Sequence, residues 1–245
     1  EDGIRDTSVT GVQTCALPIY QPDALRKRQQ TVQDLLVGSA RALSTPPGQA
    51  AQAGPGAALS AQPVVRAELQ GVLGKLLHNL SLNDDALAVR KARVQQLQAM
   101  GQRDATLAEA WQAWADSQDA RGDLAGARDS LGQALQVCQR LGMRPAALCW
   151  GIQAQQGWLM LQGGKPQDAL QLVAPAVQRL RTEAPLSLAL AQALAQMGDA
   201  LSNVGQGTSA SRHYDEAMAI RSKLWGPDRK STRLNSSHRC ISYAV

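Results

Sequence analysis

The sequence predicts an all-α fold: a right-handed superhelix, or α-solenoid, built from antiparallel helix pairs stacked in a row. First, a small residue is followed twelve positions later by Ala four times, at Gly74/Ala86, Ala115/Ala127, Gly157/Ala169 and Gly198/Ala210. Second, these pairs begin 41, 42 and 41 residues apart, and a fixed period of this size marks a stacked supersecondary unit. Third, the chain is rich in Ala, Leu and Gln, contains no Phe and lacks alternating β-branched runs.

Both ends of the chain are expected to lie outside the fold. Residues 228–245 can be encoded by a DNA string whose reverse complement encodes residues 2–19, as if one sequencing adapter had been translated on opposite strands. We therefore expect residues 1–19 and 228–245 to be adapter-derived and disordered. The biological chain is then about Tyr20–Pro227, and we expect it to be a fragment of a longer protein.

The elements follow from the N-terminus onwards. Residues 20–43 predict one N-terminal helix, with Val32, Leu35 and Leu36 on one side. Residues 44–62 are rich in Pro, Gly and Ala and predict a flexible insert. Pro63 suits a helix start, where its missing N–H costs nothing, and residues 63–227 predict an array of four helix pairs.

Within each pair the small residues have a steric interpretation. They lie where the two helices cross, so a larger side chain there would push the helix axes apart. Gly122, Gly164 and Gly205 end the first helices of the later pairs, where Gly takes the left-handed conformation without a Cβ clash. The first pair departs, with Ser81 at the turn and with Arg90 and Arg93 at packing positions of its second helix. We therefore expect that helix to be rotated or poorly packed.

Composition excludes several classes of protein. Without the two ends, 20 basic and 16 acidic residues leave a net charge of +4, and the basic cluster Arg26–Arg28 is flanked by Asp. Nucleic-acid binding is therefore not expected. Cys138 and Cys149 predict two ordinary helix thiols in a reducing compartment, so we expect a cytoplasmic protein. No apolar run is long enough to cross a bilayer, so this segment is not expected to contact a membrane.

The repeated residues resemble the tetratricopeptide repeat (TPR) over roughly Val64–Pro227. The period near 42 is similar to that of the kinesin-light-chain-like variety, and Tyr214–Pro227 resembles that variety's second helix and its exit. The resemblance implies a module that binds a protein or peptide in a concave groove lined by the first helix of each pair. The groove residues implied in this chain are Lys75, His78, Asn79, Gln112, Asp116, Asp119, Trp158, Gln162, Gln192, Asp199 and Asn203.

These candidate residues also allow a simpler interpretation, because a polar helix face is the usual solvated surface of a protein. For any single residue this interpretation comes first. Trp158 is the exception, since a large aromatic side chain in a groove is a natural anchor for a peptide, although the neighbouring pair could instead cover it. Asp116 and Asp119 favour a basic or C-terminally amidated ligand over a carboxylate.

A second resemblance concerns a longer parent protein. Thr31–Leu36, Gln62–Leu69 and Leu73-Gly74 resemble the start of the TPR region that follows the catalytic domain of some bacterial serine/threonine protein kinases. The chain itself contains no glycine-rich loop with its lysine, no HRD loop and no DFG. The alternatives are therefore a regulatory segment of such a kinase, or the TPR part of a transcriptional regulator.

The sequence offers no catalytic residues, no cofactor and no metal site. His78 and His213 stand far apart, and no Asp, Glu or Cys spacing around them suggests metal binding. We expect this segment not to be an enzyme but a scaffold or partner-sensing module with a protein or peptide partner. The last pair has no following helix, so we also expect self-association through its uncovered face.

Overall fold

The computed structural model describes residues 31–45 and 59–226, and every regular element in these ranges is helical. The all-α prediction is confirmed for this part of the chain. The ends predicted to be adapter-derived, residues 20–30 of the predicted N-terminal helix and residues 46–58 of the predicted insert lie outside the described residues.

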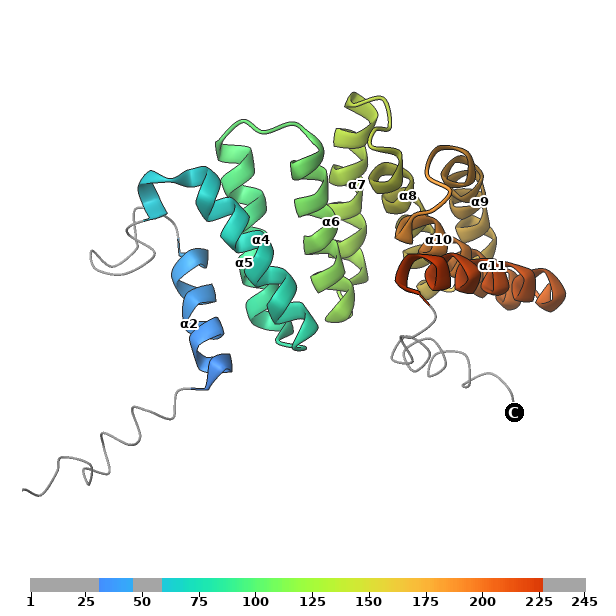
Figure 1. Ribbon diagram of the computed structural model, residues 1–245, viewed down its shortest axis with the longest axis horizontal. Helices are drawn as coiled ribbons and strands as arrows, with labels where there is room; N and C mark the ends of the chain where they lie inside the picture. Colours follow the sequence, from blue (N-terminus) through green and yellow to red (C-terminus); the bar gives the residue numbers. More distant parts are fainter. Residues whose placement is uncertain (1–30, 46–58, 227–245) are drawn as a thin grey trace, which may run out of the picture.

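The described helices form one lone helix and four pairs. The lone helix is α2 (Val32–Ser44), and a short 3₁₀ turn, η2 (Leu59–Ala61), precedes the first pair. The pairs are α4 (Pro63–Asn79) with α5 (Asn83–Ala99), α6 (Ala105–Ala120) with α7 (Leu124–Arg140), α8 (Ala146–Gln162) with α9 (Pro166–Glu183), and α10 (Leu188–Asn203) with α11 (Gly207–Trp225). They follow one another in a curved row in which α6 and α7 stand upright in the middle and α11 runs horizontally at the C-terminal end (Figure 1). The row therefore turns as it extends.

Side chains fix several helix starts. Thr31 and Asp34 form a reciprocal cap at the start of α2, in which Thr31 Oγ1 accepts from the Asp34 N–H at 3.2 Å and Asp34 Oδ2 accepts from the Thr31 N–H at 3.0 Å. Asp123 and Ser187 accept backbone N–H groups at the starts of α7 and α10. Such caps satisfy donors that have no partner within the helix. Pro63 begins α4, as its fixed φ predicts.

The turn inside each pair takes one positive-φ residue. Gly122, Gly164 and Gly205 have φ of 80°, 74° and 79°, as predicted for the ends of the first helices. Ser81 takes the same place in the first pair with φ 61°. The turn therefore keeps its geometry within the chain even where its glycine is replaced.

The predicted crossings are close contacts. A Cβ built on Gly157 would lie 3.0 Å from the carbonyl oxygen of Ala169 and closer still to Val173 Cγ2. A Cβ on Gly198 would lie 2.6 Å from the ring of Tyr214, which comes from the second helix of the same pair. Neither glycine could carry a side chain unless the helices or neighbouring side chains moved. The alanines at the crossings are buried: Ala86, Ala115, Ala127, Ala169 and Ala210 are 2% exposed or less.

The expectation of a rotated or poorly packed second helix in the first pair is wrong for α5. Val89 and Val94 of this helix are buried at 0% and 1% exposure. Arg90 is also buried, because its aliphatic stem lies over Gly74 and its Nη1 donates to the carbonyl of Ala113 at 2.7 Å and to Ser117 Oγ at 2.9 Å. The arginine therefore fills the crossing with methylenes and carries its charge to the next pair.

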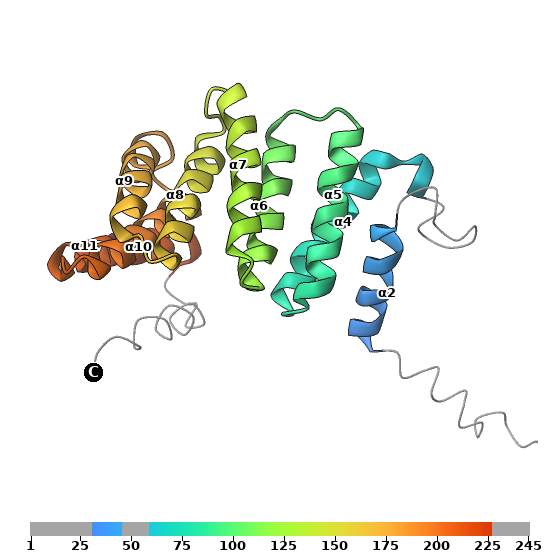
Figure 2. The ribbon, with the colours of Figure 1, turned by 180° about the vertical axis from the view of Figure 1, so that it is seen from behind.

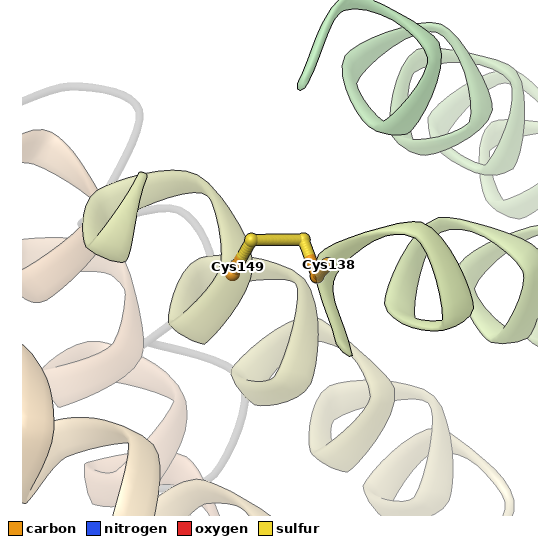
Figure 3. The surroundings of a disulfide bond; sticks show 2 residues. All are labelled: Cys138 and Cys149. Carbon is orange, nitrogen blue, oxygen red and sulfur yellow. A yellow bond between two sulfur atoms is a disulfide. The ribbon is translucent and has the colours of Figure 1, made fainter. Parts of the chain in front are cut away.

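The expectation of two free helix thiols is also wrong. Cys138, near the end of α7, and Cys149, in α8, form a disulfide with a Cα–Cα distance of 5.5 Å, and both residues are fully buried (Figure 3). Leu97 and Leu107, 41 and 42 residues earlier, are buried in the same core cluster and correspond to the two cysteines. Leu180 and Leu190 correspond to them in the following pairs and also share a core. The disulfide thus replaces a repeated leucine contact between successive pairs.

The helix α2 lies beside α4 and α5 in both views (Figures 1 and 2), and Ala40 and Leu43 pack with Leu77 and Val89. Arg66 of α4 donates through Nη2 to the carbonyls of Leu43, at 3.0 Å, and of Thr45. Arg66 occupies the repeat position of Leu107, Cys149 and Leu190, which face the second helix of the preceding pair. The helix α2 therefore takes the place of a preceding second helix.

Candidate partner-binding surface

The eleven candidate residues all lie on α4, α6, α8 and α10, the first helices of the four pairs. We call the side of these helices that carries them the first-helix face. Their exposure differs along the row: Lys75, Asn79, Gln162, Gln192 and Asn203 are exposed, whereas His78, Gln112, Asp116, Asp119, Trp158 and Asp199 are partly buried.

The middle of the first-helix face is a ladder of side-chain hydrogen bonds between α6 and α8. Gln112 Nε2 donates to Gln155 Oε1 at 3.0 Å, and Gln155 Nε2 donates to Asp116 Oδ1. One helical turn further along α6, Asp119 Oδ1 accepts a hydrogen bond from Gln162 Nε2 at 2.9 Å. The structure therefore brings four of the predicted residues together and links two successive pairs through them.

Asp116 is the charged centre of this ladder. Burial raises the pKa of its carboxyl, while the hydrogen bond from Gln155 and the nearby charge of Arg90 act in the opposite direction. Arg90 reaches this region from the other side of α6 through Ser117 and the Ala113 carbonyl. The Asp116 carboxyl thus accepts a hydrogen bond from an amide and lies within electrostatic reach of a buried guanidinium, and it retains lone pairs for a further donor.

The first pair contributes a more basic part of the face. Lys75 is exposed, and His78 is partly buried with an Nδ1 atom that has no hydrogen-bond partner. Burial and the charge of Arg90 lower the pKa of His78. The face therefore carries one exposed lysine and a histidine whose neutral form is favoured on α4, and acidic groups on α6.

The last pair uses one candidate residue internally. Asp199 accepts a hydrogen bond from the Tyr214 hydroxyl at 2.7 Å, and its backbone carbonyl accepts from Asn203 Nδ2 at 2.8 Å. Asp199 therefore helps to seat the tyrosine that covers Gly198. Gln192 and Asn203 remain exposed beside it.

Trp158 is half-buried and packs against the core cluster that α4 to α8 share. Part of its ring therefore contacts neighbouring helices, as the simpler interpretation of this residue expects. The stacked pair Trp111 and Trp114, with ring centroids 5.1 Å apart, packs against the same cluster.

Sequence reasoning missed two residues that organise this surface. Gln155 joins Gln112 to Asp116, but it does not occupy one of the family positions used to select groove residues. Its signal was its spacing, because Gln155 and Gln162 are seven residues apart and share a helix face. Arg90 departs from the repeat pattern in the sequence, but its contacts with α6 were not predicted.

Other kinds of site find little support in the part of the chain that the structure describes. A pocket of about 270 Å³ lies between α2, α4 and α5, lined in part by Ser44, Arg66 and Gln70, and it includes no candidate residue. No group of three or more His, Cys, Asp or Glu side chains among the described residues is arranged to hold a metal ion. None of the described helices is both long and apolar enough to span a bilayer.

Comparisons with known proteins agree with this architecture. The family model described as a tetratricopeptide repeat matches residues 190–229, which begin in α10 and include α11. A putative kinesin light chain of Podosopora anserina with nearly identical TPR-like repeats is 15% identical, covering 83% of this chain and 94% of that chain with a TM-score of 0.53. A variant of the same Podosopora protein is 16% identical, with coverages of 82% and 93% and a TM-score of 0.54. A comparison with curated proteins gives no match.

Identity this low shows the fold alone, and the fold is that of TPR-like repeats. The predicted all-α solenoid of TPR-like helix pairs is confirmed, and the family-model match supports the predicted tetratricopeptide-repeat identification over residues 190–229.

Proposed function

We propose that this TPR-like array binds a protein or peptide along its first-helix face, as a scaffold or as a partner-sensing module. TPR repeats are in general protein-interaction modules without catalytic chemistry, which supports a non-enzymatic role for this segment. The observation that carries the proposal is the ladder that joins Asp116 and Asp119 to Gln155 and Gln162. It holds two carboxylates of α6 in fixed positions through amide donors of the neighbouring helix α8, so little side-chain entropy remains to be lost on binding.

We further propose that the partner presents a basic group to α6. Asp116 and Asp119 each accept an amide N–H from α8, which leaves acceptor capacity for a Lys or Arg side chain. Trp158 lies on the adjoining helix and would contribute the exposed part of its ring as an apolar contact. A peptide with a basic residue beside an apolar one matches this combination.

The test is a binding titration with fluorescently labelled peptides. A set of peptides that alternate Lys or Arg with Leu is compared with the same set carrying Glu, and anisotropy is measured against the full chain. Asp119→Asn should weaken binding of the basic set by about tenfold, because one charge-assisted contact is lost. Asp129→Asn, an exposed change on α7, is the matched control and should leave binding unchanged. Equal binding of the acidic set would contradict the proposal.

A second candidate function is regulation of an attached catalytic domain. The blocks that resemble the TPR region of bacterial serine/threonine kinases begin at Thr31, which caps α2, and at Gln62, which precedes α4. The support is this sequence resemblance alone. An in-frame HRD and DFG pair upstream in the parent gene would decide for the kinase, whereas an upstream DNA-binding domain would decide for a transcriptional regulator.

The expected self-association through the last pair is supported by exposed apolar side chains on α11. Met218, Leu224 and Trp225 are 53%, 36% and 38% exposed. The cytoplasmic location stays a prediction, and it can no longer be argued from free thiols because Cys138 and Cys149 are joined.

A further inference from the structure

The outer face of α4 carries an unusual row of exposed apolar side chains. Val65, Leu69, Val72 and Leu76 are 40%, 41%, 61% and 44% exposed. We call these four residues the α4 stripe. Isolated exposed apolar residues are common on protein surfaces, but a continuous row along one helix marks an interaction surface.

The other repeats show that this face is normally covered. The residues at the repeat position of Leu69 are Ala110, Ile152 and Ala193, and they are 1%, 0% and 1% exposed. Those at the repeat position of Leu76 are Ser117, Leu159 and Ala200, with exposures of 0%, 4% and 0%.

In the last pair, α8 covers part of this face of α10, since a Cβ on Gly151 of α8 would lie 3.4 Å from the methyl group of Ala189 in α10. The helix α8 is the first helix of the preceding pair. Ala189 corresponds to Val65 of the stripe. The described residues contain α2 in the place of a preceding second helix, but no preceding first helix. Among the described residues, the α4 stripe therefore continues the internal stacking interface of the array without its usual cover.

The spacing of the stripe favours pairing with another helix along its length. Its members are separated by four, three and four residues, which is the spacing of the apolar seam in two-helix coiled coils. Two exposed charges, Glu68 and Lys75, flank the stripe on one side, while α2 covers the other side. When two such helices run antiparallel with Leu69 against Val72 of the other, Glu68 of each lies opposite Lys75 of the other.

We propose that the α4 stripe is the dimer interface of this chain, with α4 packed antiparallel against α4 of a second copy about a twofold axis. The α4 stripe of each copy is then buried against the α4 stripe of the other. Two Glu68–Lys75 ion pairs set the antiparallel direction and the register of the two helices. The ladder of α6 and α8 is not part of this interface, whereas Lys75 belongs both to the interface and to the first-helix face.

The test is sedimentation equilibrium of the full chain from micromolar to millimolar concentrations. The expected result is a reversible monomer–dimer equilibrium that Leu76→Asp shifts to monomer at every concentration. Leu186→Asp, at an exposed leucine between α9 and α10, is the control and should keep the dimer. Melting curves recorded by circular dichroism establish that each variant is folded.

Charge reversal tests the register separately from the apolar contact. Lys75→Glu should weaken dimerisation by about tenfold, since both ion pairs become repulsive, and adding Glu68→Lys should restore it to about the original constant. Glu68 also lies within electrostatic reach of Arg93, so the stability of each variant is measured alongside. A chain that stays monomeric throughout would overturn the proposal. So would a dimer that survives Leu76→Asp but is lost in Met218→Asp, or a folded double swap that fails to restore it.

Discussion

Gly157 of α8 and Ala169 of α9 lie so close that a Cβ on Gly157 would be 3.0 Å from the Ala169 carbonyl oxygen. This contact, twelve residues apart in the chain, sets the separation of the two helices in the third pair. The same pairing of small residues recurs through the array. The close approach of the two helices in each pair therefore depends on the small size of the residues at the crossing.

Replacing Gly157 by Ala should destabilise the chain by about 1–3 kcal/mol, because the added methyl group overlaps Val173 and the Ala169 backbone. Gly132→Ala is the matched control: nothing lies within 4 Å of its Cβ, so the better helix former should add about 0.5–1 kcal/mol. Urea denaturation of the two variants checks this. Equal effects of the two substitutions would contradict the crossing assignment.

Ser81→Gly should stabilise the chain by about 0.5–1 kcal/mol. Ser81 sits at φ 61°, a conformation that costs an L-residue about 1–2 kcal/mol, and part of the gain is offset by the larger entropy of Gly in the unfolded chain. The reverse change, Gly164→Ser at φ 74°, should destabilise the third pair. Thermal unfolding of both variants gives the comparison, and a loss of stability in Ser81→Gly would refute the explanation.

Much of the fold follows from the sequence because small residues at a fixed spacing leave few alternatives for helix packing. The crossing at Gly157 and Ala169 and the turn glycines were predictable from the chain alone. Arg90 was not, because a long side chain at a small-residue position predicts a clash unless one knows that its stem lies along Gly74 and its charge finds acceptors on α6. The Cys138–Cys149 disulfide was not predicted, although the repeat alignment places the two cysteines where Leu180 and Leu190 share a core.

The candidate surface was predicted less completely. Family positions identify which helices carry the site, but they do not predict which side chains bond to each other. Gln155 shows this, because its role depends on the distance between α6 and α8. Trp158 shows the converse, since its position suggested a free anchor whereas part of the ring packs against neighbouring helices.

Arg90→Met should cost about 2–3 kcal/mol, because the methylene stem over Gly74 remains but the buried Ser117 and Ala113 acceptors lose their donor. Loss of the nearby positive charge should also raise the pKa of Asp116 further. Urea denaturation and an NMR titration of the Asp116 carboxyl measure the two effects. Arg128→Met, an exposed change on α7, should alter neither, and an unchanged Asp116 pKa in Arg90→Met would contradict the electrostatic link.

Stability should fall as the pH is lowered below about 6.5, in part because of His78. Its pKa in the folded chain is lower than the ordinary value of 6.5, so the unfolded chain takes up the proton first as the pH falls. The contribution of neutral His78 is complete above this value and is lost as the pH falls toward the folded pKa. His78→Gln should flatten the dependence of unfolding free energy on pH in the range just below 6.5. An unchanged slope in this variant would contradict the assignment.

Reducing the Cys138–Cys149 disulfide should lower stability by about 2–3 kcal/mol through the entropy of the short loop that it closes. The melting temperature measured with and without dithiothreitol checks this. The double variant Cys138→Ala and Cys149→Ala should melt at the same temperature in both buffers. A wild-type chain that is insensitive to reductant, with both thiols free to alkylation when unfolded, would contradict the link between α7 and α8.

The most direct test of the central claim is a nuclear Overhauser measurement on isotope-labelled chain between the Gly157 α-protons and the side-chain protons of Leu172 and Val173 in α9. Helices that cross on a bare glycine should give strong cross-peaks to both residues. Helical chemical shifts for α8 and α9 without these cross-peaks would show that the helices form but do not pack as described, and the stacked-pair account would fail.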